Sequence, residues 1–304
     1  MSGRRKRGRP GAVRRAALVL AAVAALAAGV FYCRGRERVS PPPAKAPRVG
    51  PAAPRPEPRP SGVPSDFESV GKSGAGVVAV VLDDLGYDEQ ALAVLGRWEG
   101  PLAVAVIPGT PHAARAAALA NEKKWDLLVH LPMEPESGPS EAESIGTRDD
   151  DAVIRARILA ALAKVPGAIG VNNHQGSKAT ADPRVMRAVL AVVKEQGLFF
   201  LDSRTTNASV AARQAASLGV PFLARDVFLD DVAAEAAAKG GVPEALDAAW
   251  KRALDVAAKN GQVILLGHPR KETLAFLGPK LEALEKNQGR GAAAKAVRVS
   301  ELVP

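Results

Sequence analysis

Short apolar runs alternate with amphipathic or alanine-rich stretches from about residue 77 to the end of the chain. The first run, Val77 to Leu82, has six apolar, mostly β-branched residues and leads directly into Asp83 and Asp84. Such a run, bounded by a turn signal, is typical of a strand buried on both faces of a parallel sheet. Similar runs predict strands at 102–107, 126–130, 168–171, 198–201, 220–223, 262–266 and 296–299. Helices are predicted at 88–97, 112–122, 150–164, 183–196, 207–218, 243–259 and 271–286.

This alternation of about seven strand–helix units predicts an α/β domain with a parallel sheet. Both a barrel and a doubly wound sheet have this order of elements. Polar residues follow several of the strands, and their repeated placement favours a barrel whose functional groups share one rim. We therefore expect a distorted (β/α)7-type barrel over residues 75–304, built as a single globular domain.

The positive charge of the chain is concentrated in its amino-terminal part. The net charge is +9, yet residues 1–72 hold 15 basic and 4 acidic side chains, and the remainder holds 26 and 28. The part predicted to fold is therefore close to neutral, which argues against a nucleic-acid-binding face. A hydrophobic content of 47% is ample for a packed core.

The amino-terminal region predicts a membrane segment and a spacer. Basic residues within 1–15 precede an uncharged apolar run of 18 residues, 16–33, which is at the lower limit for a membrane-spanning helix. Positive charge before this run places residues 1–15 in the cytoplasm and the barrel in the periplasm or outside. Residues 34–74, rich in Pro, Arg and Ala, predict a disordered linker. The expected location is the inner membrane, crossed once; the alternative is secretion after cleavage near Ala25-Leu26-Ala27.

Side chains that can bind metal ions or transfer protons follow several of the predicted strands. Three of the four histidines, His130, His174 and His268, lie at predicted strand carboxyl ends. In a barrel these ends meet at one rim, so an Asp and two His are positioned to share a metal ion that keeps an open position for water. Further polar segments at strand ends are Asn172-Asn173, Asp202-Ser203-Arg204-Thr205 and Arg225 to Asp231.

Each of these residues also has a structural explanation. The Asp pair would serve as the N-cap of the next helix. His130 would be a hydrogen-bonded histidine under a loop, His174 a packing residue in a Gly- and Asn-rich loop, and His268 a turn residue before proline. The fourth histidine, His112, is expected in the first turn of a helix. The arginines would form ion pairs, Arg204 with Asp202 and Arg225 with Asp230 and Asp231.

Six motifs follow one another along the chain. They are Leu82-Asp83-Asp84-Leu85-Gly86-Tyr87, His130-Leu131-Pro132-Met133-Glu134, Asn172-Asn173-His174-Gln175-Gly176-Ser177, Leu201-Asp202-Ser203-Arg204-Thr205, Arg225-Asp226-Val227-Phe228-Leu229-Asp230 and Gly267-His268-Pro269. Over about Val77 to Lys286, this order resembles the divergent polysaccharide deacetylase family. That family is a branch of the polysaccharide deacetylase (NodB-homology) superfamily and is similar to carbohydrate esterase family 4. The resemblance implies a NodB-like barrel with one divalent metal ion, zinc or a similar ion.

The resemblance also implies a role for each site residue. Asp83 would be the general base and His268 the general acid. The implied metal ligands are Asp84, His130 and His174. The implied supporting or substrate-binding residues are Asn173, Asp202, Arg204 and Arg225. A metal ion beside Asp83 would hold the pKa of its carboxyl down, which keeps it a base at neutral pH.

Two features depart from the better-known deacetylases. Those enzymes carry both histidine ligands in one His-x-x-x-His motif, which this chain lacks. An Arg-x-x-x-Pro motif that orients the base is also missing, and Arg204 and Arg225 are the candidates to replace it. The two histidine ligands are therefore expected to come from different strands.

The expected function is a membrane-anchored, metal-dependent hydrolase that removes N-acetyl or O-acetyl groups from an envelope polysaccharide such as peptidoglycan. One alternative is a non-catalytic barrel that binds glycan or an envelope protein; another is hydrolysis of an ester or peptide amide. Asp-nucleophile chemistry is not indicated, because the Asp pair lacks Asp-x-Asp spacing. Gly71-Lys72-Ser73 precedes the first strand, so it does not form a phosphate loop. No specific protein partner is predicted.

Overall fold

Strands and helices alternate through the residues that the structure, a computed structural model, describes: 76–141, 143–230, 241–286 and 294–304. The strands are β1 (Gly76–Leu85), β2 (Ala103–Val106), β3 (Asp126–Met133), β4 (Gly170–Gln175), β5 (Phe199–Asp202), β6 (Phe222–Ala224), β7 (Val227–Phe228), β8 (Gln262–Gly267) and β9 (Ala294–Val297). The α-helices are α3 (Glu89–Leu95), α4 (Ala113–Lys123), α5 (Asp151–Lys164), α6 (Pro183–Glu195), α7 (Ala211–Leu218), α9 (Val242–Asn260) and α10 (Lys271–Lys286). Two short 3₁₀ helices are η1 (Ala179–Ala181) and η2 (Val299–Leu302).

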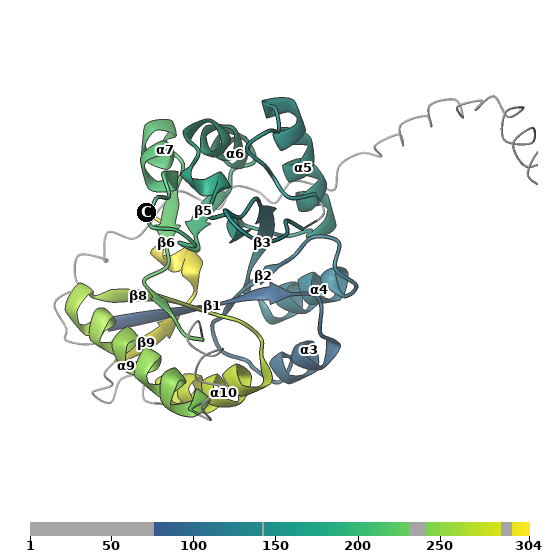
Figure 1. Cartoon of the computed structure of the whole chain (residues 1–304). Helices are drawn as coiled ribbons and strands as arrows, with labels where there is room; N and C mark the ends of the chain where they lie inside the picture. Colours follow the sequence, from purple (N-terminus) through teal and green to yellow (C-terminus); the bar gives the residue numbers. More distant parts are fainter. Residues whose placement is uncertain (1–75, 142, 231–240, 287–293) are drawn as a thin grey trace, which may run out of the picture. The chain divides into compact units, whose positions relative to one another are not determined.

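The nine strands of the described residues form one sheet in the order β6-β5-β4-β3-β2-β1-β8-β7, with β9 also paired to β1. Every strand pair in it is parallel. The sheet curls, and the helices lie around its outer side (Figure 1). The predicted α/β fold with a barrel-like parallel sheet is confirmed in the form of a curled half-barrel. The short strand β7 was not predicted.

The two edge strands, β6 and β7, are consecutive in the chain. The backbone N–H of Arg225 donates to the Asp202 carbonyl of β5, whereas the N–H of Asp226 donates to the Ile264 carbonyl of β8, both at 3.0 Å. This segment therefore spans the gap between the two edges of the sheet. It brings the carboxyl ends of β5 and β8 to the same rim as those of β1, β3 and β4.

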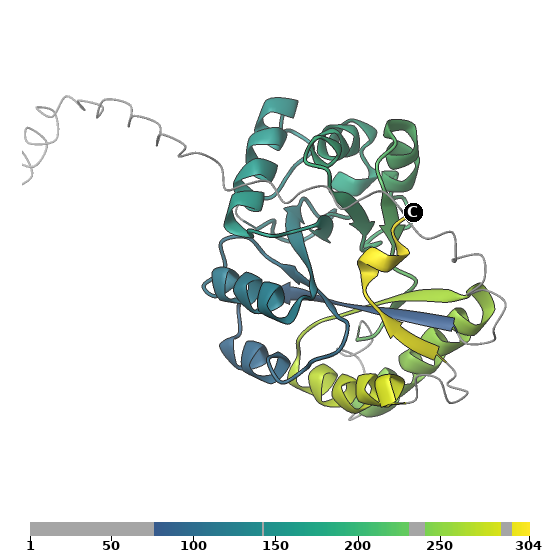
Figure 2. The same ribbon diagram turned by 180° about the vertical axis from the view of Figure 1, so that it is seen from behind.

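Alternate residues of each strand enter two different cores. In β1, Val77, Ala79 and Val81 belong to the cluster inside the curl, while Val78 and Val80 pack beneath the helices. The carboxyl-terminal η2 adds Val299 and Leu302 to the inner cluster. The backbone N–H and hydroxyl of Ser300 donate to the carboxylate of Asp126, at the start of β3, at 2.6 and 3.0 Å. The last residues (yellow in Figure 2) thus cover the amino ends of the strands, and the carboxyl ends remain for chemistry.

Three strands continue beyond their predicted carboxyl ends. Strand β1 includes the Asp pair, β3 runs on through Met133, and β4 includes His174. The predicted strand 126–130 therefore ends three residues too early, and the loop placement given as the structural explanation of His174 is wrong. The alternative explanation of the Asp pair, as the N-cap of the next helix, is also wrong. Asp88 caps α3 instead, with its side chain accepting from the backbone N–H of Gln90 at 2.8 Å.

Residues 1–15, the proposed membrane segment 16–33 and the whole of the predicted linker 34–74 lie outside the described residues. Within the described ranges, no helix is both long enough and apolar enough to cross a membrane. The membrane segment stays a prediction from sequence.

Gly86, directly after the strand that carries the Asp pair, is required by both its conformation and its surroundings. Its φ is +116°, and a Cβ there would lie 2.0 Å from Oγ1 of Thr110. We expect Gly86→Ala to lower the free energy of unfolding by about 2–4 kcal/mol, because backbone strain and a steric clash add. Urea denaturation measures the loss.

Gly138→Ala is the matched control. Gly138 also has a positive φ, +84°, but a Cβ at this position would have no atom of the described residues within 4 Å. It should lose only the backbone term, about 1–2 kcal/mol. Equal losses in the two variants would contradict the proposed clash with Thr110.

Candidate metal centre

The inner face of the sheet leads directly to a group of ionisable side chains. Val81, Leu128 and Leu266 face the interior in β1, β3 and β8. Because side chains alternate along a strand, the next inward positions are Asp83, His130 and His268. The inward-facing positions are therefore apolar along the strands and become ionisable at their carboxyl ends.

Asp84 breaks this alternation. As the neighbour of an inward-facing residue, it would point away from the interior. Its φ is +58°, in the left-handed region, and the pairing of β1 with β2 shifts register between Leu82 and Leu85. This bulge redirects the Asp84 carboxylate, so that both members of the Asp pair reach the same site.

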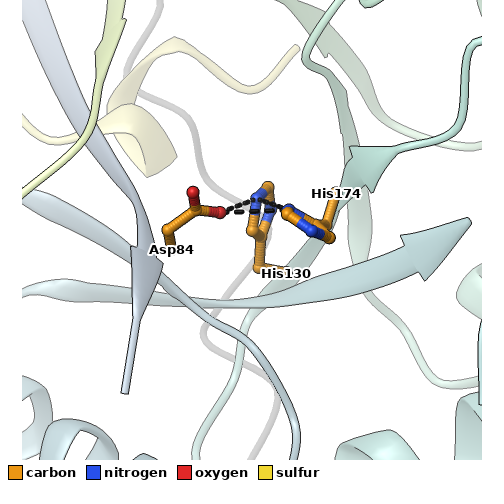
Figure 3. Close-up of side chains that lie close together, drawn as sticks. All are labelled: Asp84, His130 and His174. Carbon is orange, nitrogen blue, oxygen red and sulfur yellow. Dashed lines mark hydrogen bonds and ion pairs between the residues drawn. The ribbon is translucent and has the colours of Figure 1, made fainter. Parts of the chain in front are cut away.

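Asp84, His130 and His174 form a triangle of ligand atoms (Figure 3). Oδ1 of Asp84 lies 3.1 Å from Nε2 of His130 and 3.0 Å from Nδ1 of His174. The two imidazole nitrogens are 3.2 Å apart. Donors bound to a tetrahedral zinc ion at about 2.0–2.1 Å lie roughly 3.3 Å from one another. The three atoms therefore match one face of a tetrahedron and leave its fourth corner for water.

Hydrogen bonds show which atoms of this triangle carry lone pairs. The amide nitrogen of Asn172 donates to Oδ1 of Asp83 at 2.7 Å, so its oxygen accepts from Nδ1 of His130 at 2.9 Å. A neutral His130 consequently presents an unprotonated Nε2 to the triangle. Oδ1 of Asp84 is buried there without a hydrogen-bond partner among the described residues. An oxygen and a nitrogen that both lack protons fit a bound cation.

Burial and charge shift the pKa values of these groups. Burial raises the pKa of Asp83, which is 2% exposed. The expectation of a lowered pKa for Asp83 depends on a bound metal ion and stays a prediction. Burial opposes the charge of Asp84 as well, but its contacts with the two histidines hold its pKa well below the usual range. Burial on its own would lower the pKa of His130, yet the carboxylates of the Asp pair raise it to about 9. A proton on His130 thus offsets negative charge that a metal ion would neutralise.

His268 faces the triangle from β8. Its Nε2 lies 3.6 Å from Oδ2 of Asp84, and its Nδ1 donates to Oδ1 of Asp230 at 2.9 Å. The other oxygen of Asp230 accepts from the His268 backbone N–H and from the hydroxyl of Thr273, both at 2.9 Å. Burial lowers the pKa of His268, but the hydrogen bond to Asp230 and the negative charges of Asp230, Asp84 and Asp83 together outweigh it and raise the pKa above the ordinary value. Asp230 therefore favours the imidazolium form.

The residues predicted to support the site lie around it and not in it. Asn173 accepts from the backbone N–H of Ser203 at 2.9 Å and thereby joins β4 to the end of β5. Asp202 accepts from the backbone N–H of Arg204 and the hydroxyl of Ser209, at 2.8 and 2.6 Å. It therefore shapes the loop after β5, and its contact with Arg204 is through the backbone, not the predicted ion pair between side chains.

The two arginines differ in exposure. The side chain of Arg204 is on the surface. Arg225 donates from its guanidinium to the carbonyls of Ser203 and Arg204, and lies 4.7 Å over the ring of Phe228. That ring in turn stacks on His268 at 5.3 Å. Arg225 therefore supports the site indirectly, through Phe228 and His268. The carboxylate of Asp83 is oriented by Asn172 instead.

Sequence reasoning missed two residues of the centre. It selected Asn173, whereas Asn172 is the residue that contacts Asp83 and His130; the two lie on opposite faces of β4. Asp230, predicted as a structural partner of Arg225, instead binds His268; Asp231 lies outside the described residues. His112 is at the N-cap of α4, close to its predicted place.

Removing Asp84 should abolish metal binding. We expect Asp84→Ala to weaken zinc affinity by more than about 100-fold, a loss larger than that for a supporting residue. Competition with a chromophoric chelator measures the dissociation constant. Asp83→Asn is the matched control, because it removes a carboxylate that lies 3.7 Å from His130 Nε2 and keeps an oxygen for Asn172. If Asp84→Ala retained the zinc content of the wild type, the ligand assignment would be wrong.

This domain is similar in sequence and in fold to known proteins. The family model described as "divergent polysaccharide deacetylase" matches residues 80–302. An uncharacterized protein of Haemophilus influenzae is 36% identical over 211 residues, 69% of this chain and 72% of its own. The uncharacterized protein YibQ of Escherichia coli K12 is 36% identical over 208 residues, 67% of this chain and 61% of its own. The crystal structure of an uncharacterized protein from Agrobacterium tumefaciens C58 has the same fold, with a TM-score of 0.66 and 23% identity over 76% of this chain and 91% of its own. The chain belongs to the divergent polysaccharide deacetylase family.

Proposed function

We propose that this protein is a metal-dependent hydrolase that removes acetyl groups from an envelope polysaccharide. The observation that carries the proposal is a buried carboxylate and an imidazole beside an Asp-His-His group that could hold a metal ion. Oδ2 of Asp83 lies 3.7 Å from Nε2 of His130, and Nε2 of His268 lies 3.6 Å from Oδ2 of Asp84. Both groups are thus within reach of a water molecule and an acyl group at the open corner of the triangle.

The side chains divide the reaction between them. A bound divalent ion lowers the pKa of its water and polarises the acyl carbonyl. Asp83 accepts a proton from the attacking water, and burial makes its carboxylate a stronger base than an exposed one. His268 donates a proton to the departing nitrogen or oxygen, and Asp230 keeps it cationic until then. Cleavage of the C–N or C–O bond then yields acetate and a free amine or hydroxyl.

A cavity beside the centre supports a sugar as the substrate. It measures about 360 Å³ and is lined by Tyr87, Ile107, Pro108, Gly109, Thr110, Pro111 and Glu141. Glu141 joins it to the centre, because its Oε1 lies 3.3 Å from Nε2 of His174. The side chain of Tyr87 is 53% exposed. An exposed aromatic face with nearby hydroxyl and carboxylate groups suits a sugar ring, which has apolar faces and a polar edge.

The proposal places this reaction outside the cytoplasmic membrane. Its support is the basic stretch in residues 1–15 followed by the uncharged apolar run 16–33. On this proposal, residues 34–74 provide reach between the membrane and the polymer.

Acetate release provides the direct test. We expect the purified full-length chain, supplied with zinc, to release acetate from acetylated chitooligosaccharide or peptidoglycan. A chelator should abolish the release and added zinc should restore it, because the water is activated at the metal site. An enzymatic acetate assay measures the rate.

Asp83→Asn, with its zinc content verified, is the inactive control. Release that persists in chelator would contradict the proposed mechanism. Bound zinc without release from any glycan would favour the non-catalytic alternative, a barrel that binds glycan. Release from simple esters alone would favour an esterase.

The pH profile tests the pairing of His268 with Asp230. The pKa of His268 is raised, so the acid is present at low pH and is lost as the pH rises through that value. Asp230→Asn removes the negative charge and should move the alkaline limb of kcat/KM to lower pH by roughly 1–3 units.

Asp150→Asn removes an exposed carboxylate at the N-cap of α5, where Asn caps equally well. The profile of this variant should match the wild type. If the alkaline limb stayed in place in Asp230→Asn, His268 would not be the general acid.

A further inference from the structure

Glu141 reaches the metal centre from the connection between β3 and α5. Its Oε1 lies 3.3 Å from Nε2 of His174, and the hydroxyl of Tyr87 donates to the same oxygen at 3.2 Å. The side chain of Glu141 is 31% exposed, compared with 15% for that of His174. A half-buried carboxylate therefore contacts a proposed metal ligand on the ring edge that faces away from Asp84.

This contact determines which nitrogen of His174 is free. An ionised carboxylate only accepts hydrogen bonds, so the proton of a neutral His174 lies on Nε2. Nδ1 then carries the lone pair, and Nδ1 is the atom 3.0 Å from Oδ1 of Asp84. Glu141 is not itself a ligand of the same ion, because the imidazole ring separates it from the triangle.

His130 is held in the opposite way. Its Nδ1 donates to Asn172, a residue of β4 that is fully buried, and its Nε2 faces the triangle. The two histidines thus present different nitrogens, and each needs its own partner on the far edge of its ring. For His130 that partner is within the sheet, whereas for His174 it lies on a connection between elements.

We infer that Glu141 is a positioning residue for the metal centre, which orients His174 so that Nδ1 binds the ion, and that Tyr87 holds Glu141 in place. Tyr87 follows Asp84 by three residues, after the turn at Gly86. The segment that supplies the ligand Asp84 therefore also supplies Tyr87, which holds Glu141 beside the ligand His174. The inference rests on the metal site of the proposed function.

Zinc affinity of the full-length chain tests the inference. Glu141→Ala should weaken zinc binding by about 10- to 100-fold in chelator competition, the usual loss when a ligand's supporting partner is removed. Glu141→Gln should recover most of the affinity, because its amide keeps an acceptor oxygen at the position 3.3 Å from Nε2 of His174. The melting temperature of the metal-free protein should not change in either variant, which separates positioning from a general effect on stability.

A double-mutant cycle tests the part of Tyr87. Tyr87→Phe removes only the hydroxyl and should weaken zinc binding by less than Glu141→Ala does. In the double variant Tyr87→Phe/Glu141→Ala, the loss should equal that of Glu141→Ala alone, because the hydroxyl acts through the carboxylate. Additive losses would overturn the role of Tyr87.

Glu143→Gln is the matched control, since it removes an exposed carboxylate two residues along the same connection and should bind zinc as the wild type does. Wild-type affinity in Glu141→Ala would overturn the inference and leave the proposed function standing. So would equal losses in Glu141→Ala and Glu141→Gln, or an equal loss in Glu143→Gln. A wild-type chain that binds no zinc would overturn the metal site and the inference together.

Discussion

Three electron-rich atoms lie close together at the carboxyl end of the sheet. They require a positive charge between them, and the rest of the centre depends on it. Asp84 Oδ1, His130 Nε2 and His174 Nδ1 are separated by 3.0 to 3.2 Å. Lone pairs at such distances repel one another, and Oδ1 of Asp84 is itself buried. A positive charge among them removes the conflict, either as a metal ion or as an added proton. Without a metal ion, a proton on His130 supplies this positive charge, in agreement with the raised pKa of His130.

The supports of the centre come from separate parts of the chain. Asn172 joins the proposed base, Asp83, to the proposed ligand His130, so one amide orients a residue for proton transfer and a residue for metal binding. Asp230 performs the corresponding task for His268. A change at Asn172 would therefore disturb base and ligand together, whereas a change at Asp230 would act on the acid alone.

The apolar runs predicted every described strand except β7, and the residues that follow them include most of the side chains of the candidate site. The prediction of site residues failed where a local feature of the backbone, such as a bulge or a short strand, decides which side chains reach the centre. Asp84 enters the centre only because of a left-handed residue in a bulge, which hydrophobic periodicity does not signal. Asn172 and Asn173 differ only in the face of β4 that they occupy, and a strand with both faces buried carries apolar residues on each, so its phase is ambiguous. Asp230 reaches His268 only through the pairing of the short strand β7 with β8.

The position of β1 within the sheet has a consequence for how the domain folds. This strand, which carries both carboxylates, is paired with β2, with β8 and with β9. Its partners at Gln262–Gly267 and Ala294–Val297 are almost two hundred residues or more further along the chain. Contacts of such large sequence separation form slowly, because a long loop must close before they contribute. The strand therefore acquires its full set of partners only when β8 and β9 have joined it, so the sheet around the two carboxylates is completed late in folding.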